Sequence, residues 1–350
     1  IATTAIAAAV GIVSALSFDL KAVHIDQGST ELSRGQELQQ KSEDMTAKTL
    51  PQQIVELLPG NPFLDFTGAR PTSTIGVVIF AAFLGIAFLG VKRKQPEHAA
   101  TFSGIVDAVY AIIMRVVTLI LRLTPYGVLA IMTKTIATSN IDSIAKLGMF
   151  VIASYAALIV MFIIHLLLIT FSGLNPITYV KKAFPVMVFA FTSRSSAGAL
   201  PLNIKTQKSM GVPEGIANFA GSFGLSIGQN GCAGIYPAML AMMIAPTVGQ
   251  NPFEPGFIIS VIAIVAISSF GVAGVGGGAT FAALLVLSAL NMPVALAGLL
   301  ISIEPLIDMG RTALNVSGSM TAGLLTSKMT KETDTAVYND SSIVIEAEEA

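Results

Sequence analysis

The 350-residue chain has little charge. Only 12% of its residues are Asp, Glu, Lys or Arg, whereas 53% are hydrophobic. Soluble domains carry about 25% charged residues, so this composition excludes an ordinary soluble domain. Several apolar runs reach the ~20 residues that a membrane-spanning helix needs. We therefore expect an all-α polytopic membrane protein with the lipid bilayer as its surroundings.

Basic surface and cysteine are scarce as well. The 20 Lys and Arg residues against 21 Asp and Glu residues give a formal net charge of −1. No basic stripe remains to neutralise phosphates, which excludes a nucleic-acid partner. Cys232 is the single cysteine, so no intramolecular disulfide is expected. No Cys and His spacing is typical of a metal site, and we expect no cofactor.

The chain begins inside an apolar segment, "IATTAIAAAVGIVSALSF", without an initiating methionine. A cleaved signal peptide would instead leave a polar mature end. We expect residues 1–17 to be part of a membrane helix, with further helices upstream of Ile1. Residues 18–49 are polar and lack a helical apolar repeat, which predicts an aqueous loop.

From residue 184 onward the apolar runs are interrupted by glycine, proline and polar residues. Non-helical backbone at membrane depth is tolerated only inside protein or beside a cavity. Paired broken segments in corresponding positions indicate a binding site at the membrane midplane. The unit occurs twice, as hairpin 184–204 with broken helix 215–245, then as hairpin 256–290 with helix 297–327. We therefore expect inverted repeats with two re-entrant helical hairpins.

The placement of Lys and Arg predicts the orientation of the chain. Lysines and arginines at 92–94, 181–182, 205, 208, 328 and 331 fall on one side if the spans alternate. That side is cytoplasmic by the positive-inside rule. The loop 18–49 is then external, the first hairpin opens inward and the second opens outward. The acidic tail, residues 330–350, is then cytoplasmic.

The stretch "EPLIDMGRTALNVSG" places three charges in an apolar helix. At 100° per residue, one stripe carries Asp308, Thr312, Asn315 and Ser319. Glu304 and Arg311 flank this stripe. A charge at mid-membrane costs about 2.5–3.5 kcal/mol on insertion scales, so such residues usually face a cavity or a partner. Either Asp308 and Arg311 form a structural pair, or they bind the ammonium and carboxylate of a zwitterion. The hydroxyl and amide neighbours favour the zwitterion.

"TSRSSAG" supplies the other buried charge, Arg194. It binds substrate or neutralises Asp308 or Glu304. Ser195 and Ser196, with free backbone N–H groups at a hairpin tip, are suited to a substrate carboxylate.

Several other patterns carry less weight. "GLSIG" around Ser226 matches a nucleophile elbow, but that motif needs a strand–turn–helix. "GVGGGA" lacks the βαβ unit of a dinucleotide site. His165, alone in "MFIIHLLLI", is either a proton relay or a packed histidine, and packing is favoured. Cys232 is expected to act as a small hydrophobic residue.

Four stretches together resemble the dicarboxylate/amino acid:cation symporter family, which has the glutamate-transporter-like fold. They are "TSRSSAGALP", "IGQNGCAG", "AGVGGGAT" and "DMGRTALNVSG". Within that family they are most similar to bacterial L-cystine uptake transporters. The resemblance implies a homotrimer in the inner membrane, with scaffold and trimerisation helices at 50–135. It also implies a transport domain at 145–329, together with helix 1–17, that moves as an elevator.

The resemblance also implies roles for individual residues. Asp308 would bind the substrate α-amino group, Asn315 the α-carboxylate region, and Arg311, with Thr312 beside it, the distal group. The first hairpin tip would contribute Ser195 and Ser196. The backbone of the second hairpin, which acts as a gate, would contribute Val275 and Gly277. Arg194 matches a family arginine at the first hairpin.

The chain departs from the sodium-coupled pattern at two acids. Where that pattern has an N-M-D-G-T motif, this chain has residues 228–232, "GQNGC", so the acid is replaced by Asn230. A second acid is replaced by Ser319. Neutral oxygens bind cations more weakly than carboxylates do. The weakened cation sites implied by the resemblance comprise Thr3, Thr4, Gly224, Asn230, Asn315 and Ser319. Sodium and proton coupling both stay open, with Glu304 as the candidate proton carrier.

We therefore expect a secondary active transporter that imports L-cystine, and not an enzyme. The first alternative is a sodium-coupled symporter of glutamate, aspartate or another dicarboxylate, which Asn230 and Ser319 disfavour. An intramembrane serine hydrolase using Ser226 and a passive anion channel are two further alternatives.

Overall fold

The computed structural model describes residues 1–22, 33, 35–40, 55, 58–70, 73–121, 123, 126, 129–130, 133, 141–270, 272, 278–300 and 303–340. Within these residues every named element is helical, and an isolated antiparallel bridge joins Ile227 to Phe270. The all-helical class expected from the sequence is confirmed.

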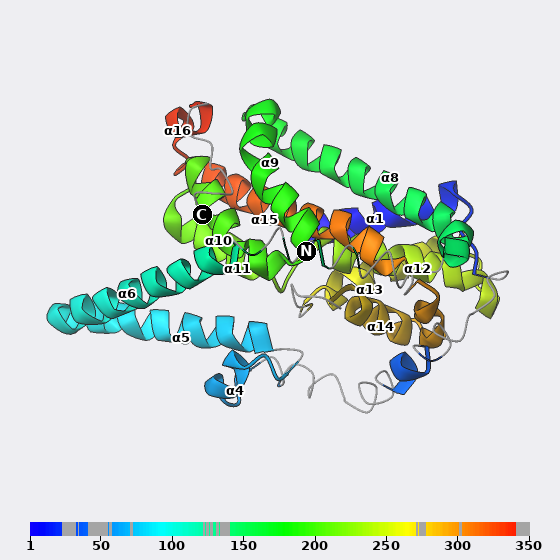
Figure 1. Ribbon diagram of the computed structural model, residues 1–350, viewed down its shortest axis with the longest axis horizontal. Helices are drawn as coiled ribbons and strands as arrows, with labels where there is room; N and C mark the ends of the chain where they lie inside the picture. The colour runs from blue at the N-terminus through cyan, green and yellow to red at the C-terminus, as the bar shows by residue number, and fades with distance from the viewer. Residues whose placement is uncertain are drawn as a thin grey trace.

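Helices of very different length make up the chain (Figure 1). The first part contains α1 (Ala2–Ser17), α4 (Pro62–Phe66), α5 (Ser73–Lys94), α6 (Pro96–Leu121) and α8 (Ile141–Phe171). The middle contains α9 (Pro176–Ser193), α10 (Ser196–Ser209), α11 (Glu214–Gly224), η1 (Asn230–Ile235), α12 (Tyr236–Ile244) and η2 (Ala245–Val248). The last part contains α13 (Pro255–Ser268), α14 (Gly278–Ala289), η3 (Val294–Leu300), α15 (Glu304–Met329) and α16 (Thr335–Asn339).

Three segments of the described chain are long and apolar enough to cross a membrane. They are Gly76–Lys94 in α5, Leu147–Phe171 in α8 and Asn230–Val248 through η1, α12 and η2. Shorter apolar helices are α1, α13 and α14. These segments identify the chain as a membrane protein.

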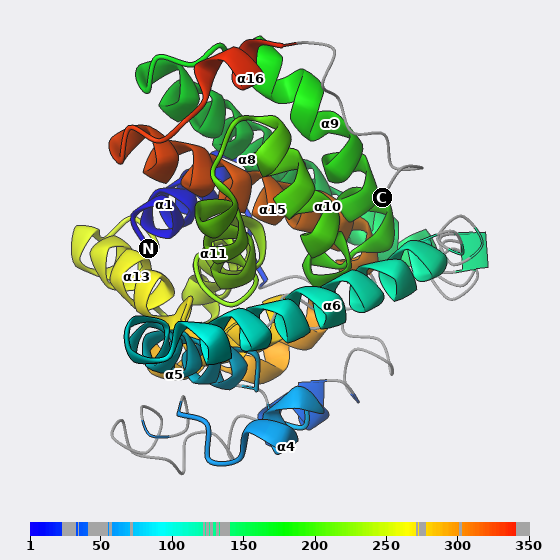
Figure 2. The same ribbon diagram turned by 90° about the vertical axis from the view of Figure 1, so that its left-hand side faces the viewer.

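Helices α5 and α6 lie side by side and extend away from the other helices (Figures 1 and 2). Phe88 packs against Phe102 with ring centroids 5.8 Å apart. Most of the remaining apolar side chains are exposed, including Ile86 and Ile112. An apolar surface of this extent marks an interaction with lipid or with other protein chains.

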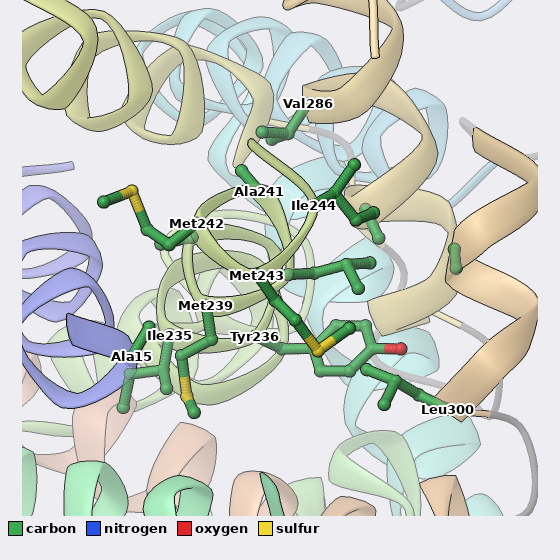
Figure 3. Packing of buried hydrophobic residues seen from close by; sticks show 14 of the residues in the cluster. Ala15, Ile235, Tyr236, Met239, Ala241, Met242, Met243, Ile244, Val286 and Leu300 are labelled. Carbon is green, nitrogen blue, oxygen red and sulfur yellow. The ribbon is translucent and has the colours of Figure 1, made fainter. Parts of the chain in front are cut away.

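Helix α12 has the opposite surroundings, because all of its side chains are buried. Figure 3 shows Met239, Met242 and Met243 around its axis, with Ala15 of α1 and Val286 of α14 beside them. Methionine is unbranched and fills irregular gaps, which suits a helix that contacts several others. α12 is therefore the centre of one half of the core.

Helix α15 is the centre of the other half and packs against α8, α9, α10, α11 and η1. Its 26 residues span about 39 Å, which is long enough to cross a bilayer. Pro305 in the first turn fits its start at Glu304, since a proline there breaks no internal hydrogen bond. The helix expected over 297–327 thus begins later, at Glu304, and residues 297–300 belong to the separate 3₁₀ helix η3. Gly310 allows α8 to approach, because a Cβ there would lie 2.8 Å from Leu158 Cδ1.

The segment expected to form the first hairpin consists of α9 and α10, which contact each other. Arg194 makes the turn in a left-handed conformation with φ of 54°. Ser195 caps α10, since its Oγ accepts a hydrogen bond from Gly198 N at 3.0 Å. At the base, Lys182 Nζ donates to Ser209 O at 2.8 Å and to Val337 O at 2.7 Å. The C-terminal helix α16 is thereby attached to the base of this helix pair.

The segment 215–245 is interrupted, as its glycines suggest. Helix α11 ends at Gly224, and a π-helical turn, η1, begins at Asn230 before α12. Gln229 precedes the turn with extended backbone. The other expected hairpin consists of α13 and α14, which contact each other. Residues 271 and 273–277, at its predicted tip, lie outside the described residues.

Candidate binding site

Four charged side chains meet where α15 begins, beside the turn between α9 and α10. Arg311 Nη2 lies 2.5 Å from Glu304 Oε1 and 3.2 Å from Asp308 Oδ1. Arg194 Nε lies 3.0 Å from Asp308 Oδ2, and its Nη2 lies 3.6 Å from Glu304 Oε2. We call these residues the charge cluster.

The charge cluster contains two guanidinium groups and two carboxylates, so its formal charge balances. This matters because an unpaired charge in a membrane interior is costly. Of the two interpretations of Arg194, neutralisation of Asp308 and Glu304 matches the observed contacts. The exposed fraction of the side chain rises from 1% at Arg311 to 20% at Arg194. The cluster is thus buried at one end and accessible at the other.

Arg311 has more donors than the cluster uses. Its Nε and Nη1 are buried and have no hydrogen-bond partner in the described part of the chain. Its guanidinium carbon lies 4.3 Å from the ring centroid of Tyr236, a favourable cation–π arrangement. Buried polar atoms are normally hydrogen-bonded, so two free guanidinium nitrogens require an explanation. A carboxylate bound between Nη1 and Nη2 would supply an acceptor for Nη1.

Other predicted site residues lie near this cluster in the fold. Ser195 and Ser196 stand at the turn next to Arg194, with Ser196 buried. Thr312 is buried one residue after Arg311. Val275 and Gly277 fall outside the described residues.

Asn315 connects α15 to the interruption before α12. Its Oδ1 accepts hydrogen bonds from Gly231 N at 2.8 Å and Cys232 N at 3.3 Å. Its Nδ2 lies 3.3 Å from Gln229 Oε1. Gly231 is required here, because a Cβ at this position would lie 2.8 Å from Arg311 Cα. Asn315 thus satisfies backbone N–H groups at the start of a helix.

Further along α15 from the charge cluster, several uncharged, buried side chains form a set that we call the neutral network. Asn230 Nδ2 lies 2.8 Å from His165 Nε2, and His165 Nδ1 lies 3.1 Å from Ser317 Oγ. Tyr179 Oη lies 2.9 Å from Ser317 Oγ and 3.3 Å from Thr321 Oγ1. The network joins α8, α9, η1 and α15.

The sequence interpretation of His165 as a packed histidine is consistent with this network, but its partners were missed. The role of Tyr179 was not predicted from the sequence. His165 and Tyr179 gave the same signal in the sequence, a lone polar side chain in an otherwise apolar stretch. Such a side chain needs a hydrogen-bond partner on another helix.

Ser319 and Asn230, two of the positions that the resemblance assigns to cations, are bonded to protein side chains. Ser319 Oγ accepts from Asn203 Nδ2 at 2.6 Å, and Asn230 Nδ2 lies 2.8 Å from His165 Nε2, whereas the buried Asn230 Oδ1 has no partner in the described part of the chain. Gly224 lies against Ser319, since a Cβ on this glycine would be 2.5 Å from Ser319 Cβ. Thr4 is buried, and its Oγ1 has no partner in the described part of the chain. No group of three or more His, Cys, Asp or Glu suited to a metal occurs among the described residues.

The site combines three features: a buried charge cluster on a long helix, an interrupted helix beside it, and a turn between two helices at its open end. This combination is typical of a membrane transport protein. The chain belongs to the sodium:dicarboxylate symporter family, whose model matches residues 1–329.

Several relatives are highly similar to this chain. A Bacillus subtilis protein is 88% identical over 350 residues, which is all of this chain and 76% of the relative. A Bacillus licheniformis protein is 85% identical over 348 residues, covering 99% of this chain and 76% of the relative. A Shouchella clausii protein is 74% identical over 340 residues, covering 97% of this chain and 73% of the relative. All three are named L-cystine uptake protein TcyP, so the resemblance to L-cystine uptake transporters is confirmed.

Proposed function

We propose that this chain imports L-cystine across the bacterial inner membrane as a secondary active transporter. The observation that carries the proposal is the buried guanidinium of Arg311 with two unused nitrogens. The far carboxylate of cystine would accept hydrogen bonds from Nη1 and, in place of Glu304, from Nη2, which lie side by side in the planar guanidinium group. The names of the relatives point to the same substrate.

The remaining contacts of the substrate follow the roles implied by the family. Asp308 would bind an ammonium group, which replaces the contact of Asp308 with Arg194. Thr312 and Asn315 would line the path between the two poles of the substrate. The two hairpin tips would close over it with Ser195, Ser196, Val275 and Gly277.

Charge balance favours cystine over a dicarboxylate. Cystine carries two ammonium and two carboxylate groups at neutral pH, so its net charge is zero. The charge cluster is also balanced, and binding cystine therefore leaves no net charge in the membrane. Glutamate or aspartate carries a net charge of −1 and would need a cation in the same site. The pairing of Ser319 with Asn203, and the lack of a charge on Asn230, disfavour such a cation.

The proposed architecture is a homotrimer with inverted repeats, re-entrant hairpins and an elevator movement. The apolar surface of α5 and α6 supports a scaffold role, since it needs lipid or neighbouring chains to cover it. The charge cluster, both helix pairs and the interrupted helix would move together. The side of Lys92, Arg93 and Lys94 would face the cytoplasm.

A proton is the proposed coupling ion, with Glu304 as its carrier. Glu304 lies one turn before Asp308 and is 13% exposed, so it is the more accessible carboxylate of the two. Binding of cystine to Arg311 would compete with Glu304 for the same guanidinium. Protonation of Glu304 would remove this competition.

Uptake of radiolabelled L-cystine into proteoliposomes tests the function. We expect uphill uptake under an inward proton gradient and inhibition by unlabelled cystine, with little inhibition by glutamate. Flux that no gradient drives uphill would indicate a channel. Turnover blocked by a fluorophosphonate would indicate a hydrolase, although Ser226 Oγ is buried and has no partner in the described part of the chain.

A further inference from the structure

A side-chain amide bridges the interrupted helix and the second helix pair. Gln229 Nε2 donates to Leu225 O at 2.5 Å and to Val272 O at 2.8 Å. Leu225 follows the end of α11, and Val272 lies between α13 and α14. The same connection is extended by the bridge between Ile227 and Phe270. Gln229 therefore joins two stretches of backbone, at Leu225 and Val272, whose carbonyl groups lie outside regular helices.

Backbone carbonyls of unwound helices are the groups that secondary transporters offer to Na⁺. A cation and an N–H group compete for the same lone pairs on a carbonyl oxygen. In this chain the amide of Gln229 occupies Leu225 O and Val272 O. Each of these two oxygens therefore already accepts a hydrogen bond from the protein, which reduces its capacity to bind a cation.

An amide also occupies the position where the family resemblance places a second acid. Asn203 Nδ2 donates to Ser319 Oγ at 2.6 Å, and Ser319 Oγ donates to Val316 O at 3.0 Å. Gln207 Nε2 in turn donates to Asn203 Oδ1 at 2.8 Å, which fixes the orientation of the Asn203 amide. Ser319 is 8% exposed and Asn203 is 3% exposed, so neither is well placed for exchange with water.

The electrostatics agree with the hydrogen bonds. Asn230 and Ser319 are neutral, and the two acids on α15, Glu304 and Asp308, are paired with arginines. A sodium ion at either amide-filled position would add one uncompensated charge to the membrane interior, which is costly. The sodium ion implied by the name of the family therefore does not fit these residues.

We propose that the amides of Gln229 and Asn203 take the place of sodium ions, so that the second helix pair closes on the interrupted helix without bound Na⁺. Sodium-independent uptake is the consequence, and only this consequence rests on the proposed transport function. The expected absence of sodium at these two positions concerns the folded chain itself and does not depend on transport.

Sodium binding to the purified full-length protein in detergent tests the proposal directly. We expect the same thermal unfolding midpoint in NaCl as in choline chloride of equal ionic strength, and no saturable binding of radioactive ²²Na⁺. A ligand that binds only the folded state raises the midpoint as its concentration rises. Saturable ²²Na⁺ binding would overturn the proposal. If Thr4→Val abolished that binding, the ion would lie at Thr4.

Two variants test the amides themselves. Gln229→Ala frees the carbonyls of Leu225 and Val272, and we expect it to weaken cystine binding on the order of tenfold, because a buried acceptor without a partner costs about 1–3 kcal/mol. Gln250→Ala is the matched control: it removes a partly exposed amide whose Nε2 donates to Glu254 Oε2 at 2.7 Å, and it should bind cystine as the parent does. Equal cystine affinity in the Gln229 and Gln250 variants would contradict the role of Gln229.

The double substitution Asn203→Ala with Ser319→Asp restores a carboxylate and removes the competing amide. We expect this variant to gain a sodium-dependent rise in its unfolding midpoint that the parent lacks. No sodium-dependent rise in a double variant that still folds and binds cystine would contradict the proposal. Failure of the parent to bind cystine would instead contradict the proposed function and leave the sodium result standing.

Discussion

Two parts of α15 differ in how they use polar groups. Its first two turns carry Glu304, Asp308 and Arg311, which contact one another and Arg194. The middle of the helix carries Asn315, Ser317, Ser319 and Thr321, whose partners in the structure are uncharged. One helix thus has a charged end and a neutral centre.

The charged end is accessible through Arg194 and Glu304, although Arg311 is only 1% exposed. At the charged end Arg194 is 20% exposed, so water or a substrate reaches the cluster there. At the neutral centre Ser317 and Thr321 are at most 1% exposed. Charged pairs with accessible members exchange partners, whereas buried neutral hydrogen bonds fix helices relative to one another. We infer that the charged end of α15 binds the substrate and that the neutral centre holds the helices in place relative to one another.

The largest expected effect is the loss of uptake in Arg311→Ala. Two charge-assisted hydrogen bonds of about 1.5 kcal/mol each amount to roughly 100-fold in affinity. We expect cystine uptake in proteoliposomes to fall by about that factor.

Folding must be monitored in the same variant, because removing one partner of a buried ion pair is destabilising. Arg311→Lys keeps the charge but loses the planar fork, so we expect a folded protein with weakened cystine binding. Uptake by Arg311→Ala equal to that of the parent would exclude Arg311 from the site.

Glu304→Gln should have the next largest effect, on coupling. The amide keeps the size of the side chain but binds no coupling proton. We expect proton-driven uptake to disappear, while exchange of internal for external cystine continues. Glu254→Gln, at an exposed position before α13, is the matched control and should leave both activities unchanged. Proton-driven uptake that survives Glu304→Gln would contradict the proton-carrier role.

His165→Ala tests the neutral centre and should affect stability more than binding. Asn230 and Ser317 would each lose a buried partner, at about 1–3 kcal/mol per group. We expect the unfolding midpoint in detergent to fall, with little change in cystine affinity for the folded fraction. His98→Ala removes an exposed histidine and should not change the midpoint. A large loss of affinity at an unchanged midpoint would move His165 into the binding region.

The charged end of α15 was predictable because its spacing is local. Glu304, Asp308 and Arg311 lie on one helix at intervals of four and three residues, which places them on one side whatever the tertiary fold. The apolar runs and glycine interruptions likewise predicted an all-helical membrane protein with a broken helix. Local periodicity was sufficient for both.

The contacts of the neutral centre, and those of Gln229, were not predictable in the same way. Asn203 and Ser319 are 116 residues apart, and Gln229 and Val272 are 43 residues apart. Helical periodicity carries no information about which helices meet across such distances. Arg194 illustrates the same limit, since the sequence left two interpretations open and only the fold brought it to Asp308.

Tyr179→Phe has the smallest expected effect. It should change the stability of the protein without changing its affinity for cystine. The substitution removes one hydroxyl, which contacts Ser317 and Thr321, and keeps the packed ring. We expect a loss of about 1 kcal/mol in the free energy of unfolding, the usual net contribution of one hydrogen bond. Tyr110→Phe, on the exposed surface of α6, should show no loss. If Tyr179→Phe changed cystine affinity as strongly as Arg311→Lys, the distinction between the two parts of α15 would be wrong. A neutral hydroxyl outside the charge cluster would then take part in binding.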